Sequence, residues 1–350
     1  MSSEIGRHQP APLTADMPAA GGMIGPEPED FVVEEIPLFE PEGNGEHCYV
    51  LLRKRRWTTP DAIRAVARAA GVRERDVGSA GLKDKHAVTT QWLSIPSGGT
   101  SVESWELPPG LEVVRASRGV RKLRTGQQRG NRFRIRLTEV PEHGLERAQA
   151  IAARLNESGL PNYFGAQRFG HGGENLERAL AWLRAGANAS GSRARFYRKL
   201  YPSVIQAEVF NRYVTLRLEH DVRRLLDGEV VRLDGSNSMF VVDDPEREQE
   251  RLLARDIHPT GPMIGPKAKS AERAARELEQ RAESGLGLDA EAARLLGRLA
   301  PGTRRDVLVW PEALEIRGGD GDLVLEFSLS SGSYATQLIR EFTRDYTARP

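Results

Sequence analysis

The stretch KLRTGQQRGNRFRIRL, residues 122–137, runs from a basic, glycine-punctuated segment directly into a predicted strand. Alternate residues of an extended chain point to opposite faces. One face of this strand therefore carries Asn131, Phe133, Ile135 and Leu137, and the other carries Arg132, Arg134 and Arg136. The alternation predicts a strand that separates a mainly apolar face from a charged one.

An amide two residues before an aromatic ring, at the mouth of a strand, is also a pattern that suits RNA. Asn131 could pair with the polar edge of a base while Phe133 stacks on its face. The alternative is that Phe133 belongs to the core and that Asn131 caps a turn. The residues alone leave both interpretations open.

Further segments alternate in the same way or show helical spacing. Strands are predicted over residues 48–52, 91–95 and 323–329, and helices over residues 142–155, 174–184, 204–218, 247–255 and 268–282. Loops are expected over residues 186–192 and 259–267, where small residues or prolines gather. Strands thus cluster toward the two chain ends, and helices dominate the middle.

Two helices have identifiable starts. Thr59-Pro60-Asp61 combines a hydroxyl for the N-cap, a proline at the first helical position and an acid near the positive end of the helix dipole, and Gly71 closes this helix. Near the C-terminus, Ser333 is expected to cap a helix that begins with Tyr334. Tyr334 either belongs to the core or lies beside backbone amides suited to a phosphate or a base carbonyl.

Length and composition describe an ordinary globular protein with room for two domains. The chain has 350 residues, 39% of them hydrophobic and 28% charged. The single cysteine, Cys48, excludes an intramolecular disulfide and a cysteine-ligated cluster, which favours a reducing cytoplasm. No apolar run of about 18 residues is present, so no membrane span is expected. Residues 1–25 are expected to form a flexible tail rather than a signal peptide.

The net charge of +1 conceals separate charged runs. Residues 27–46 contain eight acidic side chains and no Lys or Arg, residues 115–136 contain nine basic side chains and no acidic one, and residues 53–56 form a second basic run. Such runs are either solvated or paired with one another, or they contact phosphates and release counterions. Their interleaving with Asn, Gln, Gly and aromatic residues favours phosphate contacts.

The segment GLKDKHAVTTQ, residues 81–91, joins a helix to a strand and carries an acid between two lysines. Nearby cations are expected to favour the carboxylate form of Asp84, the form that acts as a base or nucleophile. The alternative is a turn aspartate beside solvated lysines. Phosphate-loop, zinc-protease and nucleophile-elbow motifs fail their spacing requirements, so nucleotide hydrolysis, zinc proteolysis and serine esterase chemistry are not expected.

Five multi-residue motifs, in order from about Asp30 to Phe342, resemble the TruD family of tRNA pseudouridine synthases. They are DFVVEE (residues 30–35), residues 81–91, residues 122–133, PNYFGAQRFG (residues 161–170) and GSYAT (residues 332–336) followed by Arg340-Glu341. The chain departs from the family pattern at Gln128, where the family usually has leucine, and at Leu329-Ser330, where it has Leu-Pro. Both positions flank motifs and affect local loop shape more than activity.

The resemblance implies an α+β protein. A pseudouridine synthase catalytic domain with a mixed, mainly antiparallel sheet is expected from residues 26–158 and 304–350, with an inserted TRUD-type α/β domain over residues 159–303. Carried over position by position, the resemblance makes Asp84 the catalytic residue and places Phe31, Asn131, Phe133 and Tyr334 around the uridine. The expected RNA contacts are Lys83, Lys85, Arg121, Lys122, Arg124 and Arg168.

The resemblance also implies a reaction, the isomerisation of a flipped-out tRNA uridine, at position 13 in the D arm, to pseudouridine. The N1–C1′ bond is replaced by a C5–C1′ bond without redox change, so neither a metal nor a cofactor is expected. Asp84 would attack the uridine or abstract a proton from the sugar, and the sequence leaves that choice and the tRNA species open. The expected partner is tRNA, bound by a monomeric cytoplasmic enzyme. The competing hypotheses are a non-catalytic tRNA-binding or chaperone protein and a structural protein without an RNA partner.

Overall fold

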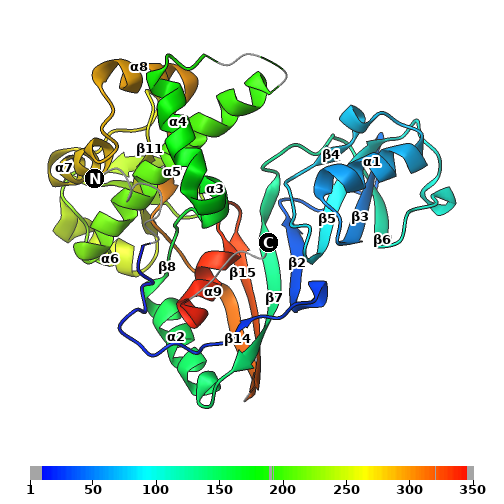
Figure 1. Cartoon of the computed structure of the whole chain (residues 1–350), viewed down its shortest axis with the longest axis horizontal. Coiled ribbons are helices and arrows are strands. Elements are labelled where there is room, and N and C mark those ends of the chain that lie inside the picture. Colours follow the sequence, from blue (N-terminus) through cyan, green and yellow to red (C-terminus); the bar gives the residue numbers. More distant parts are fainter. Residues whose placement is uncertain (1–9, 189–190, 192, 320, 345–350) are drawn as a thin grey trace. The chain divides into compact units, whose positions relative to one another are not determined.

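The computed structural model of the chain describes residues 10–188, 191, 193–319 and 321–344. These residues form two compact units, whose helices and strands are labelled in Figure 1. The sheet unit contains residues 14–157, 310–335 and 339–344, and the insertion unit contains residues 10–13, 158–309 and 336–338. Segments far apart in the sequence therefore build the sheet unit.

The sheet unit is built on one nine-stranded sheet in the described part of the chain. Its strands are β1 Met23–Ile24, β2 Phe31–Pro37, β3 His47–Arg55, β4 Gly78–Ser79, β5 Val88–Pro96, β6 Leu111–Gly119, β7 Gln128–Val140, β14 Glu312–Gly319 and β15 Gly321–Ser330. The main path runs β14-β15-β7-β2-β5-β3-β6, with β1 paired to β7 and β4 to β5. Only β2 and β5 pair in parallel among these strands. The mixed, mainly antiparallel sheet and its helices confirm the predicted α+β fold.

The predicted alternation along β7 is confirmed. Phe133, Ile135 and Leu137 are buried, whereas Arg132 and Arg134 are exposed. β15 lies antiparallel beside β7 and places Phe327 opposite Phe133. Burying a large apolar side chain stabilises the fold by about 1.5–3 kcal/mol, so this face anchors the sheet. The strands predicted over residues 48–52, 91–95 and 323–329 correspond to β3, β5 and β15.

Helix α1 spans Thr59–Ala70 and packs its apolar face on β3 and β5. Gly71 ends it at a φ of 70°, a left-handed conformation that glycine adopts readily. The predicted cap is wrong by one residue, because the hydroxyl of Thr58 accepts the Asp61 N–H at 3.2 Å. Thr59 instead occupies the first turn, where its hydroxyl is available for another contact.

Two further helices start later than predicted. Helix α2 spans Gly144–Ser158, and helix α9 spans Ala335–Thr343 with Tyr334 as its N-cap residue. Ser333 is therefore not the cap, and its N–H bonds the Ser330 carbonyl in a turn. Short 3-10 helices complete the described elements: η1 Pro28–Asp30, η2 Glu74–Asp76 and η3 Val102–Ser104.

The predicted flexible tail lies partly outside the described residues, which begin at residue 10. Residues 14–25 differ from the prediction. The Thr14 N–H and hydroxyl bond the Glu341 carboxylate at 2.9 and 2.7 Å, and β1 adds a strand to β7. Thr14 and Ala20 are fully buried. Packing and hydrogen bonds from distant segments hold this stretch in place, and a composition-based prediction has no access to them.

The insertion unit is mainly helical. Its described helices are α3 Ala166–Phe169, η4 His171–Gly173, α4 Glu174–Arg184, α5 Ala194–Glu219, α6 Pro245–Leu253, α7 Arg273–Ser284 and α8 Ala290–Leu299. Its described strands are β8 Leu160–Pro161, β9 Val230–Leu233, β10 Met239–Val241, β11 Ile257–Met263, β12 Thr303–Asp306 and β13 Leu308–Val309. They form a sheet of order β10-β9-β11-β12 and a β13-β8 pair. Helix α4 occupies the predicted residues, and the predicted loop over residues 186–192 lies partly outside the described chain.

The predicted loop over residues 259–267 is wrong in its first half, where β11 runs through Pro259 and Pro262. β9 pairs with residues 257–259 and β12 with residues 260–263. Each proline thus has a partner strand on one side only, and a missing N–H is tolerated where no partner faces it. Proline content alone therefore misled the prediction. In the same way, helix α5 continues through Pro202 and begins ten residues before the predicted start.

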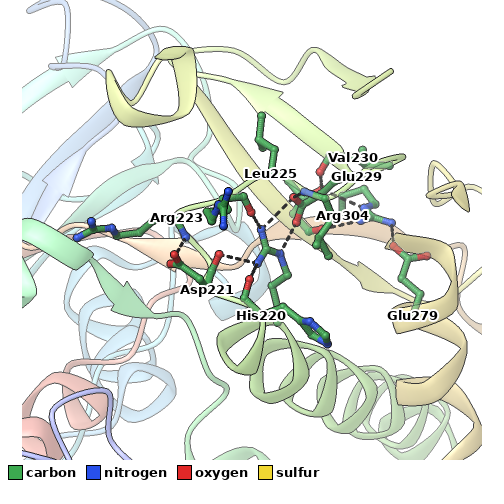
Figure 2. Close-up of polar contacts among 12 residues, drawn as sticks. His220, Asp221, Arg223, Leu225, Glu229, Val230, Glu279 and Arg304 are labelled. Atoms are coloured by element: carbon green, nitrogen blue, oxygen red, sulfur yellow. Dashed lines mark hydrogen bonds and ion pairs between the residues drawn. The ribbon is translucent and has the colours of Figure 1, made fainter. Parts of the chain in front are cut away.

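Buried charges in the insertion unit are matched in pairs (Figure 2). The fully buried Arg217, near the end of α5, donates to the Glu229 carboxylate at 2.7 Å and to the carbonyls of His220 and Asp221 at 3.3 and 3.2 Å. Arg304 of β12 donates to the Glu279 carboxylate at 2.5 Å. Because charged groups are costly to bury unless they are paired, these contacts tie the loop after α5 and helix α7 to the sheet.

Candidate active site

Asp84 lies in an irregular loop between β4 and β5, within the sheet unit. Its side chain is exposed, and among the described residues its carboxylate has no hydrogen-bond or ion-pair partner. A carboxylate without a protein partner is available to a substrate as a nucleophile or base. The side chain is therefore free, whereas the backbone that carries it is held firmly.

The backbone around Asp84 is held by Lys54 of β3, whose side chain is fully buried. The Lys54 ammonium donates to the carbonyls of Asp84 at 2.8 Å, Lys83 at 3.3 Å and Trp57 at 2.6 Å. Burial lowers the pKa of Lys54 to about 8, while the charge of Asp84 favours its protonated form and that of Lys83 disfavours it. Sequence reasoning missed Lys54, although the buried positions Val50 and Leu52 place it on the inward face of β3.

The loop has a second anchor in two polar side chains of neighbouring elements. The Thr59 hydroxyl accepts the Lys83 N–H at 2.9 Å and donates to the Gln91 side-chain oxygen at 2.9 Å. The Gln91 amide nitrogen in turn donates to the Gly81 carbonyl at 3.2 Å. Helix α1 and strand β5 thus fix the main chain on the N-terminal side of Asp84.

Lys83, one of the expected RNA contacts, has a buried side chain. Its ammonium lies 3.0 Å from the Glu35 carboxylate and donates to the side-chain oxygens of Gln128 and Asn131, each at 2.7 Å. The Lys83 and Glu35 side chains are 3% and 1% exposed. A lysine in this position joins the loop to β2 and β7, and its expected RNA contact stays a prediction.

Lys83 also decides how the Asn131 amide is oriented. An ammonium only donates hydrogen bonds, so the oxygen of Asn131 must face it. The amide nitrogen of Asn131 then has no hydrogen-bond partner among the described residues and can donate to a carbonyl oxygen. Gln128, the departure from the family pattern, is the third partner of Lys83 and reaches the Ser331 hydroxyl at 3.5 Å.

The two predicted aromatic residues lie together on the same face of the sheet. Phe31 and Phe133 meet edge to face with ring centroids 6.3 Å apart, and Phe133 stacks on Phe327 at 5.2 Å. Phe31 is 8% exposed and Phe133 is 6% exposed. Both rings are therefore largely buried against neighbouring aromatic rings, and their contact with a base stays a prediction. Phe327 is an aromatic neighbour that the sequence motifs did not indicate.

Tyr334 follows the end of β15 and is half-buried at the start of α9. Ser330, four residues before it, pairs with Gly130, and the Ser331 N–H bonds the Arg129 carbonyl at 2.9 Å. The C-terminal motif thus meets the start of β7, where Asn131 lies. Four of the five motifs contribute to this region of the sheet unit, through Glu35, Lys83, Asn131 and the segment after Ser330.

The basic residues predicted to contact RNA differ in their exposure and in their partners. Arg121 and Arg124 are exposed and have no ion-pair partner within the described chain, and Lys85 is exposed beside Asp84. Lys122 donates to the Arg75 carbonyl at 2.6 Å, which gives it a structural contact. Arg168 belongs to the insertion unit, where its guanidinium lies 5.3 Å from the ring centre of Phe164 and bonds the Ser203 hydroxyl at 3.5 Å.

Five of the eleven arginines in the two basic runs are paired with the acidic run. The pairs within the sheet unit include Arg55–Glu29, Arg56–Glu27, Arg115–Glu40, Arg132–Glu34 and Arg136–Asp30. The acidic run lies along β2 and its flanks, beside β7 and near the end of β3. Mutual pairing therefore accounts for these five arginines in the structure, and the preference for phosphate contacts stays a prediction.

No cluster of metal-binding side chains occurs among the described residues. None of the described helices has the length and apolar character needed to cross a membrane. The loop that carries the exposed Asp84 carboxylate contacts Lys54 through the Asp84 carbonyl and contains Lys83, which bonds the Asn131 carboxamide. These groups can bind a polar, uncharged ring and place a nucleophile beside it.

A family model described as "tRNA pseudouridine synthase D (TruD)" matches residues 10–176 and 187–342. The chain is 41% identical to tRNA pseudouridine synthase D of an Anaeromyxobacter species (strain Fw109-5) over 95% of this chain and 96% of that protein. It is 38% identical to a protein of the same name from Thermus thermophilus, over 94% and 90% of the two chains. The crystal structure of a protein described as a TruD from Methanosarcina mazei has the same fold, with a TM-score of 0.73, 23% identity and coverage of 98% and 97%. The chain therefore belongs to the tRNA pseudouridine synthase D family, isomerases that act on uridine in tRNA.

Proposed function

We propose that Asp84 is the reacting carboxylate of this enzyme. The observation that carries the proposal is an exposed carboxylate without a protein partner in the described chain, on a loop whose backbone is anchored by Lys54 and Thr59. Pseudouridine formation breaks the N1–C1′ bond of uridine, turns the base and joins C5 to C1′. Asp84 either adds to the uridine or removes a proton from its sugar, and each course needs an ionised, accessible carboxylate.

The target base would be held beside Asp84 by residues on the same face of the sheet. Asn131 donates its amide N–H to a carbonyl oxygen of uracil, because its own oxygen is occupied by Lys83. Phe31 and Phe133 contact the base, and Tyr334 covers it from the start of α9. A paired base would have to leave its stack, at a cost of a few kcal/mol that these contacts offset.

The finer assignments follow the family to which the chain belongs. We propose that residues 26–158 and 304–350 form the catalytic domain, that residues 159–303 form the inserted TRUD-type domain, and that the enzyme acts as a cytoplasmic monomer. The substrate is the uridine at position 13 in the D arm of tRNA, flipped out of its helix. The division of the described chain near residues 158 and 309 supports these boundaries.

Replacing Asp84 with Asn tests the catalytic role, since the change keeps size and removes the charge. We expect pseudouridine formation in a tRNA transcript to be lost while tRNA binding is retained. Asp76→Asn is the matched control, because Asp76 is a partly exposed carboxylate of the same unit that pairs with Arg73. Full activity of Asp84→Asn would refute the proposal and would instead fit a non-catalytic role for position 84.

The RNA-binding role of the unpaired arginines is tested separately. Changing Arg121 and Arg124 to Ala should weaken tRNA binding and reduce the slope of log K against log salt by about 2, at about 1 for each phosphate that is no longer neutralised. Arg53 and Arg55 are the control pair, since both already bind carboxylates, of Glu112 and Glu29. An unchanged slope in the Arg121/Arg124 variant would show that these residues do not contact phosphate.

A further inference from the structure

Lys54 is a fully buried cation whose hydrogen bonds all go to main-chain carbonyls. No carboxylate oxygen accepts a hydrogen bond from it among the described residues, and its three acceptors belong to Trp57, Lys83 and Asp84. An ammonium carries three N–H donors, so donors and acceptors match in number. A structural lysine is rarely buried in this way, and the Asp84 carbonyl is one of only three groups that it holds.

The surroundings of Lys54 connect its hydrogen bond with the Asp84 carbonyl to the proposed reaction of the Asp84 side chain. Lys54 is the penultimate residue of β3 and lies between Thr89 of β5 and Leu111 of β6, neither of which is charged. The charged groups that act on it are Asp84 and Lys83, both from the loop it anchors. The free side chain of Asp84 is thus carried on a backbone whose own carbonyl is bonded to a buried cation.

We propose that Lys54 is the positioning residue of the active site and that it holds Asp84 in its reactive position only while its amine is protonated. The inference rests on the proposed role of Asp84. A neutral amine has two N–H donors for three carbonyls, so deprotonation releases one bond, and it also removes the positive charge behind the Asp84 backbone. Lys54 touches no substrate and acts through the loop.

The protonation state of Lys54 changes within an accessible range of pH. Its pKa is lowered to about 8, with burial as the largest cause, partly opposed by the attraction of Asp84. The reactive arrangement is therefore complete near neutral pH and is lost as the pH rises through about 8. A lysine with its ordinary pKa of 10.5 would keep the loop anchored throughout this range.

The first experiment uses the unaltered enzyme. Single-turnover pseudouridine formation, followed as tritium released from C5 of uridine in a tRNA transcript, is measured from about pH 6.5 to about pH 9.5. We expect the rate to fall about tenfold per pH unit above about pH 8. A constant rate up to about pH 9.5 would overturn the proposal without any variant.

Two substitutions then test whether deprotonation of Lys54 causes this fall in rate. Lys54→Arg keeps a cation that stays protonated throughout the range, so the decline near pH 8 should disappear. Lys54→Met should lower the rate at neutral pH by about 100-fold, as expected for a misplaced catalytic group, with tRNA affinity unchanged. Arg53→Met is the control on the same strand, because Arg53 forms an exposed pair with Glu112, and it should retain both rate and pH profile.

The outcomes separate this inference from the proposed role of Asp84. An inactive Asp84→Asn enzyme together with a fully active Lys54→Met enzyme would refute the positioning role alone. Retention of the decline near pH 8 in Lys54→Arg would also refute it, because another group would then titrate. An active Asp84→Asn enzyme would remove the proposed function itself. Should Lys54→Met fail to fold, the profiles of the unaltered enzyme and of Lys54→Arg still decide the question.

Discussion

Replacing Lys83 with Met distinguishes a buried structural lysine from a surface RNA contact. The Lys83 ammonium is 3.0 Å from the Glu35 carboxylate, and both side chains are almost completely enclosed. The substitution leaves the Glu35 charge buried without its cation and removes the bonds to Gln128 and Asn131. Breaking a buried ion pair on one side costs about 3–5 kcal/mol.

A loss of this size is easily measured. At about 2–4 °C per kcal/mol for a unit of this size, Lys83→Met should lower the melting temperature by roughly 10 °C. The double variant Lys83→Met/Glu35→Gln removes the stranded charge and keeps an acceptor for the Trp92 N–H, which Glu35 binds at 3.2 Å. We therefore expect the double variant to be more stable than Lys83→Met and less stable than the unaltered protein. Urea and thermal unfolding provide the measurements.

The same variant has a binding readout. Since the Lys83 side chain is only 3% exposed, the salt dependence of tRNA binding by folded Lys83→Met should match that of the unaltered protein. A stability change below about 1 kcal/mol, which is the range of exposed ion pairs, combined with a salt slope smaller by about 1, would refute the buried position of Lys83. It would restore the RNA contact that the sequence predicted.

Three further outcomes follow from single groups. The pKa of Lys54 is lower in the folded protein than in the unfolded chain, so the unfolded chain binds more protons between about pH 8 and 10.5. The free energy of unfolding of the unaltered protein, relative to that of Lys54→Met, should therefore rise by about 2 kcal/mol from about pH 7 to about pH 9.5 in urea titrations. A constant difference between the two proteins would contradict that pKa. Arg217→Met strands the fully buried Glu229 carboxylate and should cost about 3–5 kcal/mol in urea unfolding, and a cost near zero would mean that the pair is solvated. Thr58→Ala removes the cap on the Asp61 N–H and should cost about 1 kcal/mol by the same measurement, whereas equal stability would argue against the cap.

Local sequence patterns correctly predicted the strands and helices in which burial of one face sets the order of apolar and polar residues. Strand β7 alternates because one face of the sheet is buried, and that burial is visible in the order of residues. Helix α4 has apolar residues at helical spacing and an acidic first turn, so it occupies the predicted residues 174–184. These elements depend on contacts that every sheet or amphipathic helix makes.

Two segments that were wrongly predicted as a loop and a tail depend on contacts with residues distant in the sequence. Strand β11 tolerates Pro259 and Pro262 because its two partner strands cover different halves of it. The segment after residue 14 is held by Glu341, more than 300 residues away in the sequence. Neither arrangement leaves a trace in the residues nearby, so composition and period indicated a loop and a tail.

The sequence by itself determined the α+β class, the family, and Asp84 as the candidate for catalysis, because motif spacing and face alternation are properties of the chain. Only the tertiary structure decided which charges are free. Strand register brings Glu34 beside Arg132 and sets Glu35 against Lys83, so part of a basic run becomes internal pairing and a lysine expected to contact RNA is a buried anchor. Whether a charge is paired depends on which segments contact one another in the folded chain. For Lys54, the contact between β3 and the loop of Asp84 bonds a buried ammonium to the Asp84 carbonyl.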